Sequence, residues 1–66
     1  MKIIVNGEPR QVPEGCTARQ LLELLELGDA RVAMEVNLEI VPRSRHAGHV
    51  LREGDRVEVV RAIGGG

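Results

Sequence analysis

Few residues of this 66-residue chain could do chemistry. The sequence ends in three consecutive glycines, Gly64, Gly65 and Gly66, and so in a carboxylate with no side chain beside it. A terminal carboxyl group is ionised at neutral pH and can act as a nucleophile. Glycine loses more conformational freedom on ordering than any other residue, so these three do not help a fold. Either the tail is a remnant without a role, as many chain ends are, or its carboxylate is the functional group.

A cysteine and two histidines are the other candidates. His46 and His49 are three residues apart with a glycine between them, but no second cysteine or placed carboxylate completes a set of metal ligands. We therefore expect no metal site and assign both histidines to a surface loop. Cys16 has no partner for an internal disulfide. The field of a following helix would lower its pKa, yet we expect its role to be structural or incidental.

Composition narrows the class of protein. Charged residues make up 29% and hydrophobic residues 42% of the chain, which is the balance of a folded domain. The formal net charge is −1 and there is no Phe, Tyr or Trp, so nucleic-acid binding is not expected. No apolar run is long enough to span a membrane, and the N-terminal residues enter a strand pattern instead of a signal peptide. A single cysteine fits a reducing compartment, and we expect a cytoplasmic protein.

The N-terminal residues predict a β-hairpin. Residues 3–5 and 10–12 have strand character, and Asn6-Gly7 between them suits the two positive-φ positions of a type I′ turn. Pro9 lacks an N–H group, so the second strand should lie at the edge of its sheet.

Residues 17–28 carry the helix pattern. Thr17 and Gln20 have the spacing of a capping box at its start. Gly28 is expected in the left-handed position that follows the end of a helix. The apolar residues at helical spacing form one stripe, made of Ala18, Leu21, Leu22 and Leu25.

The second half of the chain predicts three more strands. Residues 32–36 alternate between two faces, residues 39–41 form a short strand and residues 56–62 form the last one. The segment between the last two strands, residues 43–55, is expected to be a loop with turns. Three arginines make this loop basic, which fits either a solvated surface or a second contact with a partner: Arg43, Arg45 and Arg52.

The order of these elements indicates a fold. A helix of about three turns must bury its leucine stripe, and one face of the sheet is the available partner. Hairpin, helix and further strands follow the order of the β-grasp fold, an α+β arrangement with a mixed sheet of four to five strands packed on one helix. We expect one domain over residues 1–62 and a flexible glycine tail over residues 63–66. The expected core is Ile3, Val5, Leu21, Leu22, Leu25, Val32, Met34, Val36, Val57 and Val59.

Two apolar residues are expected on the outward face of the sheet. Ile4 and Val60 stand among polar neighbours, and if the first and last strands are adjacent these side chains would sit together. Isolated exposed aliphatic residues are ordinary on proteins. We nevertheless expect this pair to contact a partner. The expected docking residues are Ile4, Val60, Arg61 and Ile63, with Ala33 as a further candidate.

Four motifs stand in order along nearly the whole chain. They are "VNGEP" at the first turn, "NLEIVPRS" over residues 37–44, "LREGDRVEVV" over residues 51–60 and the terminal diglycine. In this combination the sequence resembles the ThiS family of ubiquitin-like sulfur-carrier proteins in thiamin biosynthesis. Relatives often have glycine at the position of Leu38, so Asn37 is expected to take the left-handed conformation and leave Leu38 partly exposed. Gly64 extends the usual pair of glycines to three.

The resemblance implies a chemistry for the tail. In the family, the C-terminal carboxylate attacks the α-phosphate of ATP in a ThiF-like adenylyltransferase. Sulfur from a persulfide, supplied by a sulfur-donor enzyme, then replaces AMP, and the resulting thiocarboxylate donates sulfur through a ThiG-like thiazole synthase. On this chain the reacting residue would be Gly66, and Gly64 and Gly65 would thread into the active site of the partner. The chain itself would bind no cofactor and would not be an enzyme, because ATP and the persulfide act through the partner enzymes.

Other functions are compatible with the same residues. A related carrier could supply sulfur to molybdopterin or to transfer RNA, or could be conjugated to lysines as a protein modifier. A β-grasp interaction or RNA-binding module with an inert tail belongs to another class, although the missing aromatic residues and basic excess count against RNA. Deletion of Gly66 separates the classes, because a carrier would lose its function and an interaction module would not.

Overall fold

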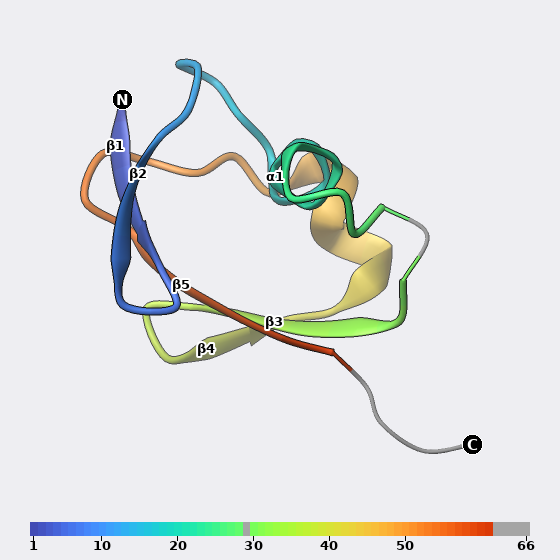
Figure 1. Ribbon diagram of the computed structural model, residues 1–66. Coiled ribbons are helices and arrows are strands. Elements are labelled where there is room, and N and C mark those ends of the chain that lie inside the picture. Colours follow the sequence, from blue (N-terminus) through green and yellow to red (C-terminus); the bar gives the residue numbers. More distant parts are fainter. Residues whose placement is uncertain (29, 62–66) are drawn as a thin grey trace.

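The computed structural model describes residues 1–28 and 30–61, so the predicted tail over residues 63–66 and the domain boundary at residue 62 lie outside the described residues. Five strands form one sheet in the order β2-β1-β5-β3-β4, with β1 parallel to β5 and the other neighbours antiparallel. Figure 1 shows helix α1 on one side of this curved sheet. The elements are β1 (Lys2–Val5), β2 (Glu8–Gln11), α1 (Ala18–Leu24), β3 (Val32–Val36), β4 (Glu39–Val41), the 3₁₀ helix η1 (Arg43–Gly48) and β5 (Arg56–Arg61). The predicted mixed sheet over one main helix is confirmed.

Both hairpins turn through two residues with positive φ. In the β1–β2 hairpin these are Asn6 at 49° and Gly7 at 84°, which confirms the predicted type I′ turn, and β2 is an edge strand as predicted. In the β3–β4 hairpin they are Asn37 at 52° and Leu38 at 71°. The expected left-handed conformation of Asn37 is confirmed, and Leu38 shares it because a two-residue turn of this type needs positive φ at both positions. Leu38 is also more than partly exposed, at 85%.

Helix α1 begins as predicted and ends differently. The Oγ1 of Thr17 accepts from the N–H of Gln20 at 3.1 Å, and Oε1 of Gln20 accepts from the N–H of Thr17 at 3.0 Å, which completes the capping box. At the other end Glu26 has a φ of 61°, so Gly28 is not the left-handed residue after the helix. The N–H of Glu26 donates to the carbonyl of Glu23 and the N–H of Leu27 donates to that of Leu22, which is the Schellman pattern.

The core lies between the sheet and the two helices, and it is larger than predicted. Of the predicted residues, Leu25 and Val32 are only partly buried and pack against its edge. Connecting segments and the short strand β4 supply the buried residues that were not predicted: Val12, Cys16, Val41 and Leu51, together with Ala18 at the start of α1. Among residues 1–28 and 30–61, no helix is long and apolar enough to cross a bilayer.

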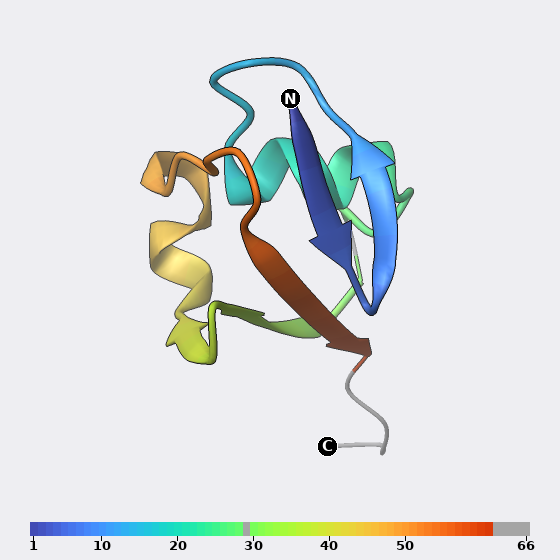
Figure 2. The same ribbon diagram turned by 90° about the vertical axis from the view of Figure 1, so that its left-hand side faces the viewer.

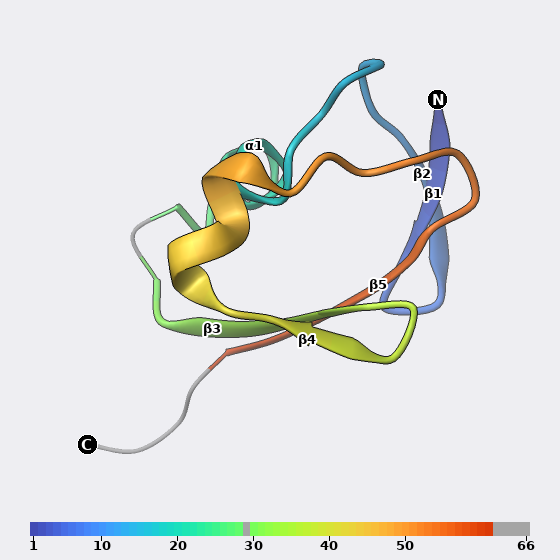
Figure 3. The same ribbon diagram turned by 180° about the vertical axis from the view of Figure 1, so that it is seen from behind.

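The segment after β4 is not the loop that was predicted. Arg43–Gly48 forms the 3₁₀ helix η1, which lies beside α1 (Figure 3). His46 is 5% exposed, and its Nε2 lies 2.8 Å from the carbonyl oxygen of Val41, so the placement of this histidine on the surface is wrong. Glu53 and Gly54 form the predicted turn, with φ of 82° at the glycine.

Candidate functional site at the end of strand β5

Strand β5 lies in the middle of the sheet, between β1 and β3, and leads to the C-terminal tail. Its last residue, Arg61, is also the last residue of the chain that the structure describes. The predicted site residues Ile63, Gly64, Gly65 and Gly66 lie outside the described residues. The described part of the candidate site is therefore the tail root, by which we mean Val59, Val60 and Arg61.

The two sides of the tail root are held in different ways. On one side β3 continues to the end of β5, with Ala33 opposite Val60 and Val32 opposite Arg61. On the other side the pairing of β1 with β5 ends at Val57, whose carbonyl accepts from the N–H of Asn6 at 2.8 Å. Beyond that point it is the side chain of Asn6 that bonds to Val59, with Oδ1 accepting from its N–H at 2.9 Å and Nδ2 donating to its carbonyl at 3.3 Å.

The outward face next to the tail root is both apolar and acidic. Val60 is 62% exposed and lies opposite the exposed Ala33. Two residues nearer the start of β5, Glu58 lies opposite Glu35, and Glu35 lies opposite Ile40 of β4, which is 74% exposed. We call these five residues the outer patch. Like charges directly opposite each other on a sheet are unfavourable, so stability does not explain the Glu35–Glu58 pair.

Ile4 does not belong to this patch. It is partly buried and lies opposite Arg56, four residues before Val60 on β5. At strand spacing that is roughly 13 Å from Val60, so the prediction that Ile4 and Val60 sit together is wrong. The adjacency of β1 and β5 was predicted correctly and is visible in Figure 2, but their parallel register was not. The docking role of Ile4, Val60, Arg61 and Ile63 stays a prediction.

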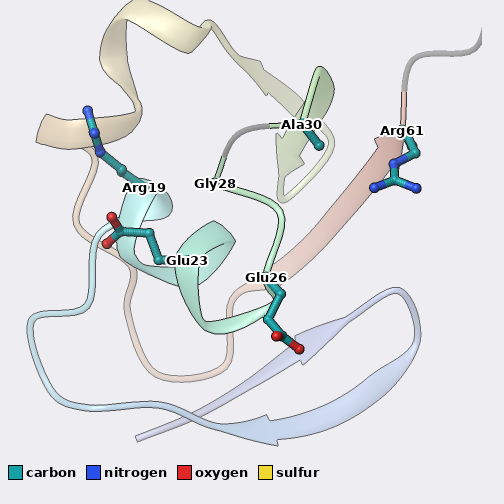
Figure 4. Close-up of a pocket in the computed structure, with 6 residues that line it drawn as sticks. All are labelled: Arg19, Glu23, Glu26, Gly28, Ala30 and Arg61. Atoms are coloured by element: carbon teal, nitrogen blue, oxygen red, sulfur yellow. The ribbon is translucent and has the colours of Figure 1, made fainter.

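A shallow depression of about 550 Å³ lies beside the tail root on the helix side (Figure 4). Its lining residues come from α1, from the segment that follows α1 and from β5: Arg19, Glu23, Glu26, Gly28, Ala30 and Arg61. Figure 4 shows the guanidinium groups of Arg19 and Arg61 on opposite sides of it. Among the described residues that line it, two arginines and two glutamates balance in charge, so these residues provide no cationic excess of the kind that binds phosphate.

The cysteine and the histidines do not converge on a site. Cys16 is 2% exposed and its Sγ lies 3.5 Å from the carbonyl of Thr17. Burial raises the pKa of the Cys16 thiol, the opposite of the lowering that a helix terminus would give. His49 contributes its carbonyl to the N–H of Ala18. Within the described parts of the chain, no three side chains among His, Cys, Asp and Glu are grouped so that they could hold a metal ion.

Comparisons with known proteins identify the family. The ThiS family model matches residues 3–66. The chain is 36% identical to the sulfur carrier protein ThiS of Escherichia coli, with both proteins covered over their full length. It is 44% identical over all of its residues to the thiazole synthase of Paramagnetospirillum magneticum, and it spans only 20% of the length of that relative.

A solved structure confirms the fold. The crystal structure of the thiamine biosynthesis protein ThiS of Geobacter metallireducens matches with a TM-score of 0.85 and 33% identity, and both chains are covered completely. The β-grasp fold predicted from the order of the elements is therefore confirmed. The match to the family model extends through the terminal glycine. The chain belongs to the ThiS family, which also includes the sulfur carrier protein ThiS of Escherichia coli.

Proposed function

We propose that the chain carries sulfur as a thiocarboxylate on Gly66. The terminal carboxylate attacks the α-phosphate of ATP held by a ThiF-like adenylyltransferase, and pyrophosphate leaves. The terminal sulfur of a persulfide then displaces AMP to form an acyl disulfide with the donor, and attack of a thiol on the donor's sulfur releases the thiocarboxylate and leaves a disulfide. This group donates its sulfur to thiazole formation. ATP and the persulfide act through the partner enzymes, and the chain binds neither by itself.

The family match through residue 66 is the observation that carries this proposal. The position of β5 supports it, because the tail continues from a central strand held by neighbours on both sides. If extended, residues 62–66 reach about 17 Å beyond Arg61. This length would bring the carboxylate of Gly66 into a buried nucleotide site while the folded body remained outside. Gly64 and Gly65 have no side chains that would obstruct a narrow channel.

Three partners follow from this chemistry: the adenylyltransferase, a sulfur-donor enzyme and a ThiG-like thiazole synthase. The relatives named thiazole synthase support the last of these. In each of them a section that is 44% identical to this whole chain belongs to a polypeptide about five times longer. A carrier section and a thiazole synthase thus occur within one protein, as expected for components that act in sequence.

Docking of the body has to compensate for ordering the tail. Ordering a residue costs about 1–2 kcal/mol, so four tail residues cost about 4–8 kcal/mol. The outer patch is the surface best placed to offset this, because Val60 lies next to the start of the tail and is exposed beside Ala33. A matching partner surface would have an apolar contact for Val60 and a cationic group facing Glu35 and Glu58. Arg61 and Ile63 would complete the contact at its rim.

Intact-mass measurement of the protein purified from its native host tests the proposal. We expect a fraction of the molecules in which one terminal oxygen is exchanged for sulfur, and deletion of Gly66 should abolish that fraction. A conjugate to lysine would redirect the function to protein modification. A tail without any modification, in cells that make thiamin through this chain, would contradict the proposal.

A further inference from the structure

Asn6 has a second role besides its place in the turn. Its φ of 49° occupies the first positive-φ position of the β1–β2 turn, which asparagine and glycine both accept. A turn residue needs nothing more than this backbone conformation. Its side chain nevertheless reaches across to Val59, 53 residues later in the chain, and makes two hydrogen bonds there.

These two bonds extend the sheet where β1 has already ended. The regular parallel ladder runs from the N–H of Ile4, which donates to the carbonyl of Asp55, to the N–H of Asn6, which donates to that of Val57. The next bond of such a ladder would run from the N–H of Val59 to the backbone carbonyl of Asn6, but β1 ends at Val5 and the chain turns at Asn6. Its carboxamide offers an acceptor and a donor in place of that backbone and satisfies both polar groups of Val59.

We propose that Asn6 is a positioning residue for the reactive tail. By bonding Val59 it holds the tail root on the side that β1 leaves open, so the tail departs from a strand that is fixed on both sides. This inference rests on the proposed function, because the tail matters only if its carboxylate reacts. Without the carboxamide, Val59–Arg61 would be held by β3 alone and would fray more readily. A partner would then have to order these residues together with the tail.

Asn37 provides a matched control at the opposite end of β5. It occupies the same position of the β3–β4 turn, with φ of 52°. Its Oδ1 accepts from the N–H of Arg56 at 3.0 Å, and its Nδ2 donates to Oδ1 of Asp55 at 3.0 Å. Asn6→Gly and Asn37→Gly both keep a residue suited to positive φ and both remove two side-chain hydrogen bonds. Asn6→Gly releases the end of β5 next to the tail, whereas Asn37→Gly releases Arg56, at the end remote from the tail.

Amide hydrogen exchange measured by NMR tests the structural half. In Asn6→Gly, the amides of Val59 and Val60 should exchange about tenfold faster than in the wild type, relative to Met34 in the core. In Asn37→Gly the acceleration should fall on Arg56 and leave Val59 unchanged. Equal acceleration along the whole of β5 in both variants would overturn the inference, because the two asparagines would then only stabilise the fold.

Kinetics with an adenylyltransferase test the functional half. Initial rates of pyrophosphate release should show a rise in KM for the Asn6→Gly carrier of about fivefold to tenfold, since more residues must be ordered on binding. Its kcat should stay within about twofold, because the reacting group is unchanged. Asn37→Gly should retain both constants. Equal effects of the two variants would refute positioning.

A conservative variant keeps the test decisive if Asn6→Gly fails to fold. Asn6→Asp retains an acceptor for the N–H of Val59 and loses the donor to its carbonyl, so its KM should exceed that of the wild type by about twofold to threefold, less than is expected from loss of both bonds. A KM equal to that of the wild type would contradict a role for the donor. If the wild-type chain itself releases no pyrophosphate, the proposed function fails, whereas the exchange result still decides whether Asn6 holds the tail root.

Discussion

Leu38 offers the sharpest test of the strain in the fold. It has φ of 71° and is 85% exposed, so its side chain gains little from packing while its backbone is held in the left-handed region. Left-handed backbone costs a residue with a Cβ about 1–2 kcal/mol, which glycine does not incur. Glycine increases the entropy of the unfolded chain, which offsets about 0.4–1 kcal/mol of the gain. Leu38→Gly should therefore stabilise the protein by roughly 0.5–1 kcal/mol.

The assay is thermal and urea unfolding of the wild type beside three variants. For a domain of this size, a gain of that magnitude raises Tm by about 2–8 °C. Leu38→Ala removes the exposed side chain but keeps the strained backbone, so it should show no comparable gain. Leu38→Asn should give an intermediate gain, since asparagine accepts positive φ more readily. If alanine stabilised as much as glycine, exposure of the leucine and not backbone strain would be the cause, and the reasoning would be refuted.

The remaining predictions concern the helix end, the outer patch and the thiol. Glu26→Gly should stabilise the protein by about 0.5–1 kcal/mol in urea unfolding, because it relieves the positive φ of 61° at the end of α1. A lower free energy of unfolding would mean that the Glu26 side chain makes a contact that outweighs the backbone strain. Val60→Asp should keep the Tm and lower the rate of adenylation at limiting carrier concentration by about tenfold or more. Val50→Asp, a change at another exposed valine, should retain the wild-type rate of adenylation. Equal rates for the two variants would exclude the outer patch as a docking surface. Cys16 should react with a thiol reagent at pH 8 at least about a hundredfold more slowly in the native than in the unfolded protein, because burial raises its pKa and blocks access; similar rates would contradict its burial.

Local signals in the sequence predicted most of the fold. Asn6-Gly7 determines the first turn because both residues accept positive φ. Thr17 and Gln20 determine the start of α1 because the side chain of each bonds to the backbone N–H of the other. The alternation along β5 correctly predicted which of its side chains point outward. These features need no knowledge of residues far away in the chain.

Long-range geometry accounts for what the sequence did not predict. The parallel register of β1 against β5 depends on how the whole sheet assembles, and this separated Ile4 from Val60. Packing of η1 against α1 buries His46, although a segment rich in Arg, Gly and His has the composition of a loop. Helix α1 also ends earlier than expected, so Glu26 takes the positive φ that had been predicted for Gly28.

In the candidate site, too, local features could be predicted from the sequence and long-range contacts could not. The terminal glycines could be recognised from their type and position, and the family resemblance assigned them a chemistry. The role of Asn6 at the tail root could not be predicted from the sequence, because an asparagine before a glycine is already explained by the turn. The pairing of Glu35 with Glu58 also depends on register. For the role of Asn6, the only signal in the sequence was an asparagine at a turn position where glycine would suffice.

The most direct measurement uses the purified chain, ATP and a ThiF-like adenylyltransferase. Pyrophosphate release is followed over time, and fragmentation mass spectrometry then locates any AMP adduct on the carrier. We expect pyrophosphate release that depends on the carrier and an acyl-adenylate on the carboxylate of Gly66, with both lost when Gly66 is deleted. Release without the carrier, or an adduct at Lys2 instead of Gly66, would contradict a carrier that is activated at its C-terminal carboxylate.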